Sequence, residues 1–404
     1  TTKSEGQPVF PTCYSMDSDV RRQESPGELS SIGKDPSDAH RQPDYKDLKE
    51  FTGWIQTRMA DGSLKSGKLS YSLRDLRLFI GGLAMSRLHL LQGISGTGKT
   101  SLPAAFAEAI GAGRSILPVQ AGWRDRQDLL GHYNAFERRF LETRFLQALY
   151  EASTPQWREQ PYLIVLDELN LSRPEQYFAD FISIFEQPEG ERRIELMSQS
   201  IDPAPKGLED GRFLRLPKNV WFIGTANKDE TTLEIADKTY DRSHVMELPR
   251  HREKVDASEK APLREPLGLV GLERAFNKAQ RDHAEKADKA LDWLEKFLRE
   301  PLYRLFRVGW GNRLERQARA FVPVIKAAGG SAGEAVDHLL ATRLLRRICD
   351  RHDVRVESYR ALGDTLRNAW KQLEDNNGQP FHSLALIEDQ LNQLSFDRVD
   401  EEAE

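Results

Sequence analysis

Short apolar runs alternate along this chain with segments whose apolar residues recur every three or four positions. Strands buried on both faces of a parallel sheet carry such runs without polar alternation, because helices cover both faces. The intervening segments have the period of helices that pack on such a sheet. The pattern predicts an α/β fold with a parallel five-stranded sheet between helices. The five runs are Leu88–Leu91, Ser115–Val119, Tyr162–Leu166, Val220–Ile223 and Val245–Leu248.

Beyond about residue 252 the strand-like runs end and only helical periodicity remains. Three segments have this spacing, at Leu272–Leu298, Leu314–Val324 and Ala335–Ile348. We therefore expect an α/β core over residues 46–252 and a separate all-α domain, with further C-terminal helices, over residues 253–404.

The first 45 residues differ in composition from the rest of the chain. Fifteen of them are Ser, Pro or Gly, and eight are acidic against five basic. Such a stretch buries too little apolar surface to offset the entropy of ordering it. We expect residues 1–45 to form a disordered tail or linker, with a docking motif at Phe10–Tyr14 as the alternative.

A glycine-rich segment follows the first apolar run and opens a helix. Residues 93–100, with the sequence GISGTGKT, have the spacing of a phosphate-binding loop. The glycines let backbone N–H groups turn toward phosphate oxygens, and the next helix presents its positive end. Lys99 would contact the β- and γ-phosphates, and the Thr100 hydroxyl would bind Mg²⁺. The expected nucleotide contacts are Gly93, Ser95, Gly96, Thr97, Gly98, Lys99, Thr100 and Ser101.

Two later runs end in polar residues that would complete a hydrolytic site. The third run is followed by Asp167 and Glu168, and the fourth leads to Asn227. Asp167 is expected to hold Mg²⁺, and Glu168 to polarise the attacking water, since successive strand residues point to opposite sides. Asn227 would orient that water; the alternative is that it only begins a turn. Together with the phosphate loop, the acid pair predicts hydrolysis of a nucleoside triphosphate.

In this order the three elements resemble the AAA+ superfamily, and the sequence around them is similar to its McrB-like branch. MoxR-type and dynein-related AAA+ modules are relatives of that branch. The resemblance implies an AAA+ P-loop core followed by a helical lid, and assembly into a ring, expected to be a hexamer, with the nucleotide between subunits. The similar segments are residues 91–103, 119–123, 128–131, 166–170, 224–232 and 240–242, with a weaker likeness to about residue 353.

The resemblance also assigns roles to arginines. In AAA+ rings an arginine from one subunit stabilises the transferring phosphoryl group in its neighbour. Arg242 matches this finger, with a surface ion pair to Asp241 as the alternative, and Arg173 is a candidate for a second contact in trans. The helical lid supplies a nucleotide sensor, which corresponds to Arg313, with Arg307 and Arg316 as alternatives. The relatives also insert a β-hairpin before the sensor strand, expected here from residues 194–196 and 213–216.

ATP is the expected nucleotide, with GTP as the alternative. The GTP-hydrolysing member that gives the branch its name continues its sensor strand with Met-Asn and, two residues later, Asp-Arg. Residues 226–231 here read ANKDET and lack both features. The segment 227–230 has Glu where the guanine-reading element requires Asp, and it occupies the sensor position instead.

Charge and composition limit the range of partners. The chain of 404 residues has a formal net charge of −5, which argues against nucleic-acid binding over its whole surface. Residues 301–360 carry twelve Lys and Arg against six Asp and Glu, so this segment is compatible with a local basic surface that binds DNA. No run approaches the ~18 apolar residues of a membrane span. Cys13 and Cys349 lack a metal-binding spacing, and we expect free thiols in a cytoplasmic protein without membrane contact.

These observations support one leading function and two alternatives. The leading hypothesis is Mg²⁺-dependent ATP hydrolysis by a ring-forming AAA+ motor. By resemblance, this is the NTPase subunit of a bacterial restriction or anti-phage defence system that drives a partner nuclease or effector on DNA. The sequence contains no nuclease constellation, so any cutting would be done by the partner. The alternatives are a MoxR-like chaperone that remodels a protein, and a nucleotide-dependent assembly switch with little turnover.

Overall fold

The contacts within the chain define two compact units. A computed structural model describes residues 8–23, 47–227, 233–250, 255, 257, 259–349, 351 and 353–401, apart from the side chains of residues 18–23 and 395–401. We call the first of the two units the α/β unit; it comprises Thr1–Asp44, Thr57–Ser70 and Arg87–Leu272. We call the second the helical unit; it comprises Tyr45–Gln56, Tyr71–Ser86 and Glu273–Glu404.

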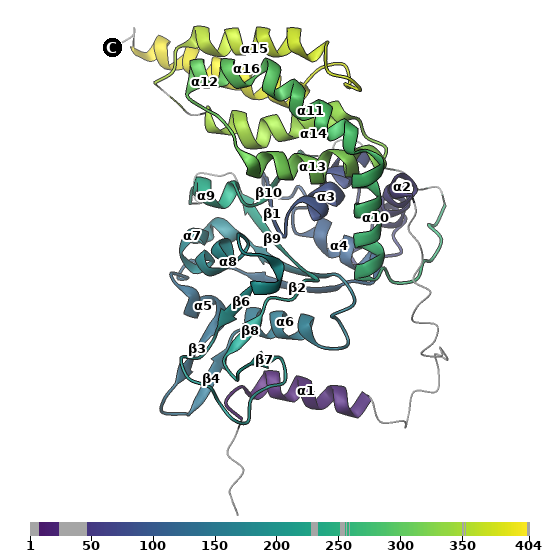
Figure 1. Ribbon diagram of the computed structural model, residues 1–404, viewed down its shortest axis with the longest axis vertical. Coiled ribbons are helices and arrows are strands. Elements are labelled where there is room, and N and C mark those ends of the chain that lie inside the picture. The colour runs from purple at the N-terminus through teal and green to yellow at the C-terminus, as the bar shows by residue number, and fades with distance from the viewer. Residues whose placement is uncertain are drawn as a thin grey trace, which may run out of the picture. The chain divides into compact units, whose positions relative to one another are not determined.

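A parallel five-stranded sheet forms the centre of the α/β unit (Figure 1). Its strand order is β10-β1-β9-β5-β2, and every neighbouring pair is parallel. All five predicted strands are confirmed. Because the strands are parallel, their carboxyl ends meet at one edge of the sheet, where ligands bind in folds of this kind. The strands are β1 Leu88–Gly93, β2 Gly113–Pro118, β5 Tyr162–Asp167, β9 Val220–Asn227 and β10 His244–Glu247.

Helices of the α/β unit pack on this sheet through their apolar faces. Helix α6 begins where the Thr143 side chain accepts a hydrogen bond from the Leu146 N–H, and α4 ends at Gly111, whose φ is 70°. Phe145 of α6 packs against Phe181 and, from the sheet, Phe222. The helices are α4 Ser101–Ile110, α5 Arg126–Leu130, α6 Arg144–Ser153, α7 Pro174–Tyr177, α8 Ala179–Ile184 and α9 Asp237–Tyr240, with 3₁₀ turns at Leu169–Leu171 and Glu189–Glu191.

Two small antiparallel sheets extend from the α/β unit. The predicted hairpin before the sensor strand is confirmed, since β6 Arg193–Glu195 pairs with β8 Phe213–Arg215, and β7 Leu208–Glu209 adds a third strand. A second hairpin, β3 Gly131–Asn134 with β4 Arg139–Glu142, was not expected from the sequence. It occupies the segment between β2 and α6.

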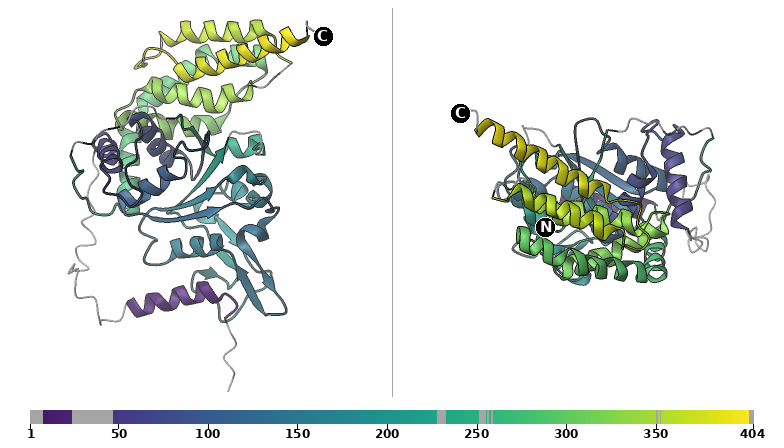
Figure 2. Two further views of the ribbon diagram at one scale, coloured as in Figure 1. Left: turned by 180° about the vertical axis from the view of Figure 1, so that it is seen from behind. Right: turned by 90° about the horizontal axis from the view of Figure 1, so that it is seen from above.

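Within the predicted tail, residues 8–23 form a docked element, which corrects the expectation for this part of it. Helix α1 Pro11–Gln23 lies beside the β3–β4 hairpin (Figure 2). Phe10 stacks on Phe140, with 4.6 Å between ring centroids, and both Phe10 and Cys13 are buried. The docking alternative for Phe10–Tyr14 therefore holds, because a few apolar side chains suffice when a distant surface accepts them. The rest of the predicted tail, residues 1–7 and 24–45, lies outside the described residues.

The helical unit contains the helices predicted after residue 252, with one correction. The segment expected as one helix, 272–298, is two helices, because the backbone leaves the helical region at His283, where φ is −123° and ψ is 21°. The helices are α10 Leu269–Asp282, α11 Ala284–Phe297, α12 Arg299–Phe306, α13 Asn312–Ala327, α14 Ala332–Leu339, α15 Val356–Trp370 and α16 Phe381–Glu401. A π-helical turn Leu340–Leu344 and a 3₁₀ turn Leu345–Arg347 follow α14.

Helix α3 Leu73–Met85 also packs in the helical unit, although it precedes the sheet in sequence. Helix α2 Leu48–Ala60 belongs to the helical unit up to Gln56. A Cβ atom added at Gly81 of α3 would lie 2.8 Å from Ile325 Cδ1 and 2.9 Å from Phe321 Cε2 of α13, so glycine allows a close approach. Arg77 of α3 donates to both carboxylate oxygens of Glu334, at 2.8 and 2.6 Å. The predicted boundaries, 46–252 and 253–404, group α3 with the core instead. Among the helices of the described chain, none has the length and apolar character needed to cross a membrane.

Candidate active site

The glycine loop connects the end of β1 to the start of α4. Gly93, Gly96 and Gly98 have φ values of 147°, 80° and 85°, which side-chain-bearing residues rarely adopt. At Gly93 a Cβ atom would lie only 2.6 Å from the backbone oxygen of Leu248. Lys99 Nζ donates to the backbone oxygens of Gly93 at 3.0 Å and Ile94 at 2.7 Å. The loop therefore has the curled backbone and the adjacent ammonium group that phosphate binding requires.

The remaining predicted loop residues lie in the same turn. Thr100 is the N-cap residue of α4, and Ser101 is the first residue of that helix. Ser95 and Gly96 are exposed, whereas Thr97 is buried and donates from its hydroxyl to the Ile94 backbone oxygen at 3.1 Å. The exposed part of the loop thus lies at the N-terminus of α4, a helix of ten residues. The N-terminus of a helix attracts negative charge.

The acid pair lies at the carboxyl end of β5, at the same edge of the sheet. Thr100 Oγ1 donates to Asp167 Oδ1 at 2.6 Å, so the structure brings the two predicted metal ligands together. Glu168 is exposed and has φ 55° and ψ 50°, in the left-handed region. A residue other than glycine in this region stores backbone strain, and such strain is concentrated at functional sites.

The end of β9 adjoins both the loop and the acid pair. Asn227 is the register partner of Gly93, at the point where the glycine loop begins. Its backbone oxygen accepts a hydrogen bond from Asn170 Nδ2 at 2.9 Å, just beyond the acid pair. Asn227 ends β9, which lies between β1 and β5 in the sheet, and whether it also begins a turn falls outside the described residues. The role of Asn227 in orienting water near Glu168 stays a prediction.

Sequence reasoning missed Thr225, two residues before Asn227. Its hydroxyl donates to Asp167 Oδ1 at 2.7 Å and accepts from the Glu168 N–H at 2.9 Å. A polar residue inside an otherwise apolar strand, close to its carboxyl end, was the available sign.

The donor set at this edge fits Mg²⁺. The hydroxyl of Thr100 and the carboxylate of Asp167 are hard oxygen ligands, and Mg²⁺ is usually held by one or two such protein groups together with substrate phosphates and water. Over the described residues, no group of three or more His, Cys, Asp or Glu side chains gathers as an all-protein metal site. The hydroxyl and carboxylate of Thr100 and Asp167 favour a metal that binds together with a phosphate ligand.

The predicted arginines are distributed over both units. Arg242 follows α9, and its Nε donates to Glu186 Oε1 at 3.0 Å, so the arginine forms an ion pair with Glu186. Arg173 is exposed at the N-terminus of α7. Arg313 lies in the first turn of α13 in the helical unit. Of its alternatives, Arg307 is the C-cap residue of α12 and Arg316 lies in α13.

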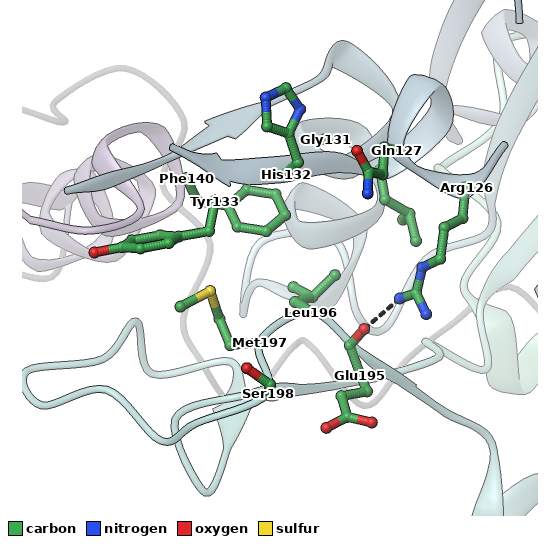
Figure 3. Close-up of a pocket in the computed structure, with 11 residues that line it drawn as sticks. Arg126, Gln127, Gly131, His132, Tyr133, Phe140, Glu195, Leu196, Met197 and Ser198 are labelled. Atoms are coloured by element: carbon green, nitrogen blue, oxygen red, sulfur yellow. Dashed lines mark hydrogen bonds between the residues drawn. The ribbon is translucent and has the colours of Figure 1, made fainter. Parts of the chain in front are cut away.

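A separate hollow of about 360 Å³ lies between the β3–β4 hairpin and the segment after β6 (Figure 3). The side chains of Tyr133 and Phe140 face Leu196 and Met197 across it. Arg126 closes one end by donating to the Glu195 backbone oxygen. None of its lining residues belongs to the glycine loop or the acid pair. The hollow is therefore distinct from the candidate active site.

A glycine loop after the first strand, an acid pair on a neighbouring strand and a polar sensor strand between them define a P-loop nucleotide-binding domain with the AAA+ fold. Residues 89–243 match the AAA domain family, in its dynein-related subfamily. The matched segment runs from β1 to the start of β10 and includes the loop, the acid pair and Asn227. Curated proteins give no match to the chain. The assignment to the McrB-like branch stays a prediction.

Proposed function

We propose that the protein hydrolyses ATP with the help of Mg²⁺. One observation carries the proposal: the glycine loop and the acid strand meet through the 2.6 Å hydrogen bond between Thr100 and Asp167, beside the exposed Glu168. A site that only bound nucleotide would need the loop but not an adjacent, exposed carboxylate. The matched AAA domain supports nucleotide binding and hydrolysis in general.

Each residue of the site has one role in the proposed reaction. Lys99 and the backbone N–H groups of residues 93–101 would bind the phosphates, and Thr100 and Asp167 would hold Mg²⁺. When bound, Mg²⁺ neutralises phosphate charge and polarises the γ-phosphoryl group. Glu168 accepts a proton from the attacking water at a carboxylate oxygen, and the Asn227 side chain orients that water. Water adds to the γ-phosphorus as the bond to the β-phosphate oxygen breaks, giving ADP and phosphate.

The reaction is proposed to occur in a ring, expected to be a hexamer, with Arg242 reaching the neighbouring subunit's nucleotide. A guanidinium group supplied in trans stabilises charge on the transferring phosphoryl group. The Arg242 side chain is 23% exposed and its partner Glu186 is 41% exposed, so solvent reaches this ion pair. Exposed pairs contribute little to stability, which makes the arginine available for exchange to another anion. Arg173 and Arg313 are proposed as further phosphate contacts.

ATP is proposed over GTP because residues 226–231 lack the Met and Asp-Arg features of the GTP-hydrolysing branch member. Competition binding separates the two nucleotides directly. We expect ATP to displace a fluorescent ATP analogue at lower concentration than GTP. Equal or stronger displacement by GTP would reverse the assignment.

The proposed partner is a nuclease or other effector that the motor drives on DNA, as part of a bacterial defence system. The support is the resemblance to the McrB-like branch and the basic composition of residues 301–360. We expect DNA to raise the rate of ATP hydrolysis, with a stimulation that weakens as salt rises. If neither duplex nor single-stranded DNA changes the rate, the MoxR-like protein-remodelling function replaces this proposal.

Nucleotide binding tests the loop assignment. Lys99→Ala should abolish binding of ATP, because it removes the only positive side chain of the loop. Lys218→Ala, which removes an exposed lysine of the same α/β unit ahead of β9, is the matched control and should bind as the wild type does. Retained affinity in Lys99→Ala would refute the phosphate-loop assignment.

Mixing two variant proteins tests whether Arg242 acts on the nucleotide of the neighbouring subunit. Arg242→Ala and Glu168→Gln should each bind ATP but turn it over poorly. In mixed rings, some interfaces combine an intact Glu168 with an intact Arg242, so part of the activity should return. A mixture as inactive as its two components would show that Arg242 does not act in trans.

A further inference from the structure

Thr225 connects the sensor strand to both members of the acid pair. The residue is 2% exposed, and its hydroxyl oxygen lies 2.7 Å from Asp167 Oδ1 and 2.9 Å from the Glu168 backbone nitrogen. A hydroxyl group has one proton to donate. Since the Glu168 N–H donates to the hydroxyl oxygen, the Thr225 proton is directed to the carboxylate. The two hydrogen bonds therefore orient each other.

Asp167 Oδ1 receives a second hydroxyl from the glycine loop. Thr100 Oγ1 lies 2.6 Å from the same oxygen that accepts from Thr225. The proposed function assigns Thr100 to the metal, and it assigns no ligand to Thr225. Thr225 is thus a hydroxyl donor to Asp167 to which the proposed function gives no metal-binding role. It orients the carboxylate from the side of β9, whatever Thr100 binds.

The Glu168 backbone is held at the same place. The left-handed conformation of Glu168 needs surrounding contacts that maintain it. Its N–H is bound by Thr225, and the Asn170 side chain binds the Asn227 backbone oxygen at 2.9 Å. At Gly224 a Cβ atom would lie 2.7 Å from Leu169 Cδ1, so glycine admits the turn after Glu168 close to β9.

We propose that Thr225 is a positioning residue that sets the carboxylate of Asp167 toward the metal and holds Glu168 in its left-handed conformation. It acts through these two residues and does not touch substrate. Its β-branched side chain restricts the χ1 rotation and thereby the direction of the hydroxyl. This inference rests on the proposed function, because it deepens the account of the same site.

Thr225→Val tests the inference, because valine keeps the shape and removes the hydroxyl. Partners behind a metal ligand typically matter about 10- to 100-fold in metal affinity or activity. We expect a loss of this size in turnover. The Mg²⁺ concentration that half-saturates Mg²⁺-dependent tightening of ATP binding should rise, while ATP affinity without Mg²⁺ stays unchanged. Thr225→Ser, which keeps the hydroxyl, should recover most of the wild-type Mg²⁺ response.

A matched control separates positioning from general destabilisation. Thr154→Val removes another buried hydroxyl of the α/β unit, one that donates to the Glu151 backbone oxygen at 2.7 Å away from the acid pair. It should leave the Mg²⁺ response unchanged. If Thr225→Val fails to fold, Thr225→Ala carries the same test, since it places no extra apolar atoms against the carboxylate.

The outcomes distinguish this inference from the proposed function. A wild-type Mg²⁺ response and wild-type turnover in folded Thr225→Val or Thr225→Ala would overturn the role of Thr225 alone. Equal defects in the Ser and Val variants would do the same, because the hydroxyl would then be irrelevant. A wild-type protein that binds MgATP without turnover would contradict the proposed function, while the Mg²⁺ response of the variants would still decide on Thr225.

Discussion

Two carboxylates in the α/β unit, Asp167 and Glu142, both accept hydrogen bonds but from different kinds of donor. Asp167 Oδ1 accepts from two threonine hydroxyls, at 2.6 and 2.7 Å. Glu142 accepts from the backbone N–H groups of Thr12, at 2.8 Å, and Cys13, at 2.9 Å. The Thr100 hydroxyl can rotate and offer a lone pair to a metal, whereas an N–H group in the first turn of a helix can only donate. The kind of group that donates to each carboxylate therefore distinguishes the two regions. We call the second region, Glu142 with the Thr12 and Cys13 amides, the clamp.

The clamp around Glu142 holds several elements together. Besides the Phe10–Phe140 stack, Asp17 of α1 accepts from the Tyr150 hydroxyl at 2.9 Å and from the Lys206 N–H at 2.7 Å. Helix α1 thus contacts the β3–β4 hairpin, α6 and the segment before β7. We expect this region to affect stability, and the Asp167 region to affect catalysis.

The largest effect is expected from Phe10→Ala. Truncating a buried phenylalanine costs about 3–5 kcal/mol. Here the loss should release α1 and leave the sheet folded, because α1 packs at the edge of the unit. Hydrogen exchange over residues 11–17 should become rapid while ATP turnover stays unchanged. Phe136→Ala, which removes a fully exposed ring of the neighbouring turn, is the control and should leave exchange unaltered. Protected amides in Phe10→Ala would refute the anchoring role.

Asp167→Asn should have the next largest effect, and it should act on chemistry. Loss of one preorganised electrostatic group typically costs about 10²–10³-fold in kcat, or roughly 2.7–4 kcal/mol. The half-saturating Mg²⁺ concentration should also rise, and the thermal midpoint should change little. A variant with normal turnover and normal Mg²⁺ dependence would remove Asp167 from the metal site.

The sequence predicted the location of the candidate site better than the contacts around Glu142. The glycine loop, Asp167 and Asn227 are readable because strand ends and local spacing place them at one edge of a parallel sheet. The clamp escaped detection because its partners, Cys13 and Glu142, are separated by 129 positions and share no local pattern. Thr225 was missed for a related reason: its role depends on strand order, which a residue pattern alone does not give.

The pair formed by Arg242 and Glu186 also lay beyond sequence reasoning, which offered Asp241 as the alternative partner. Neighbours along the chain are easy to propose, but the turn after α8, which holds Glu186, and the turn after α9 meet only in the folded unit. The break at His283 was hidden because its flanking helices continue nearly the same apolar period. The sequence pattern therefore predicted the helices, strands and motifs. Contacts between distant segments decided which side chains pair and where each helix ends.

Glu142→Gln should have a moderate effect on the clamp. Loss of a charged cap at a helix N-terminus costs about 0.5–2 kcal/mol. Exchange at the Thr12 and Cys13 amides should accelerate, and turnover should match the wild type, in contrast to Asp167→Asn. A loss of turnover as large as in Asp167→Asn would mean that the two regions are coupled.

The smallest effect is a pH dependence of the clamp. Burial, together with the nearby Glu142, raises the pKa of the Cys13 thiol above its usual range. A raised pKa means that docking favours the protonated thiol, so its stabilising contribution is complete below the undocked pKa of about 8.5 and falls as pH rises beyond it. At pH ~9.5, about one unit above the undocked pKa, the docked state should lose about 1.4 kcal/mol.

Thiol alkylation in a Cys349→Ala background checks this pH dependence, because only Cys13 then reacts. Cys13 should react slowly at neutral pH and faster as α1 is released at high pH, and hydrogen exchange in Cys13→Ala should lose the pH dependence. Alkylation of wild-type Cys13 at the rate of an unfolded thiol near neutral pH would contradict its burial in the clamp.

The central claim is that the acid pair beside the glycine loop hydrolyses ATP with Mg²⁺. Its most direct test is phosphate release from MgATP by the wild type and by Glu168→Gln, with ATP affinity measured on the same samples. We predict equal affinity, steady release by the wild type, and a loss of about 10²–10⁴-fold in the variant. Undiminished release by Glu168→Gln, or absence of release from nucleotide-saturated, assembled wild type, would contradict the claim.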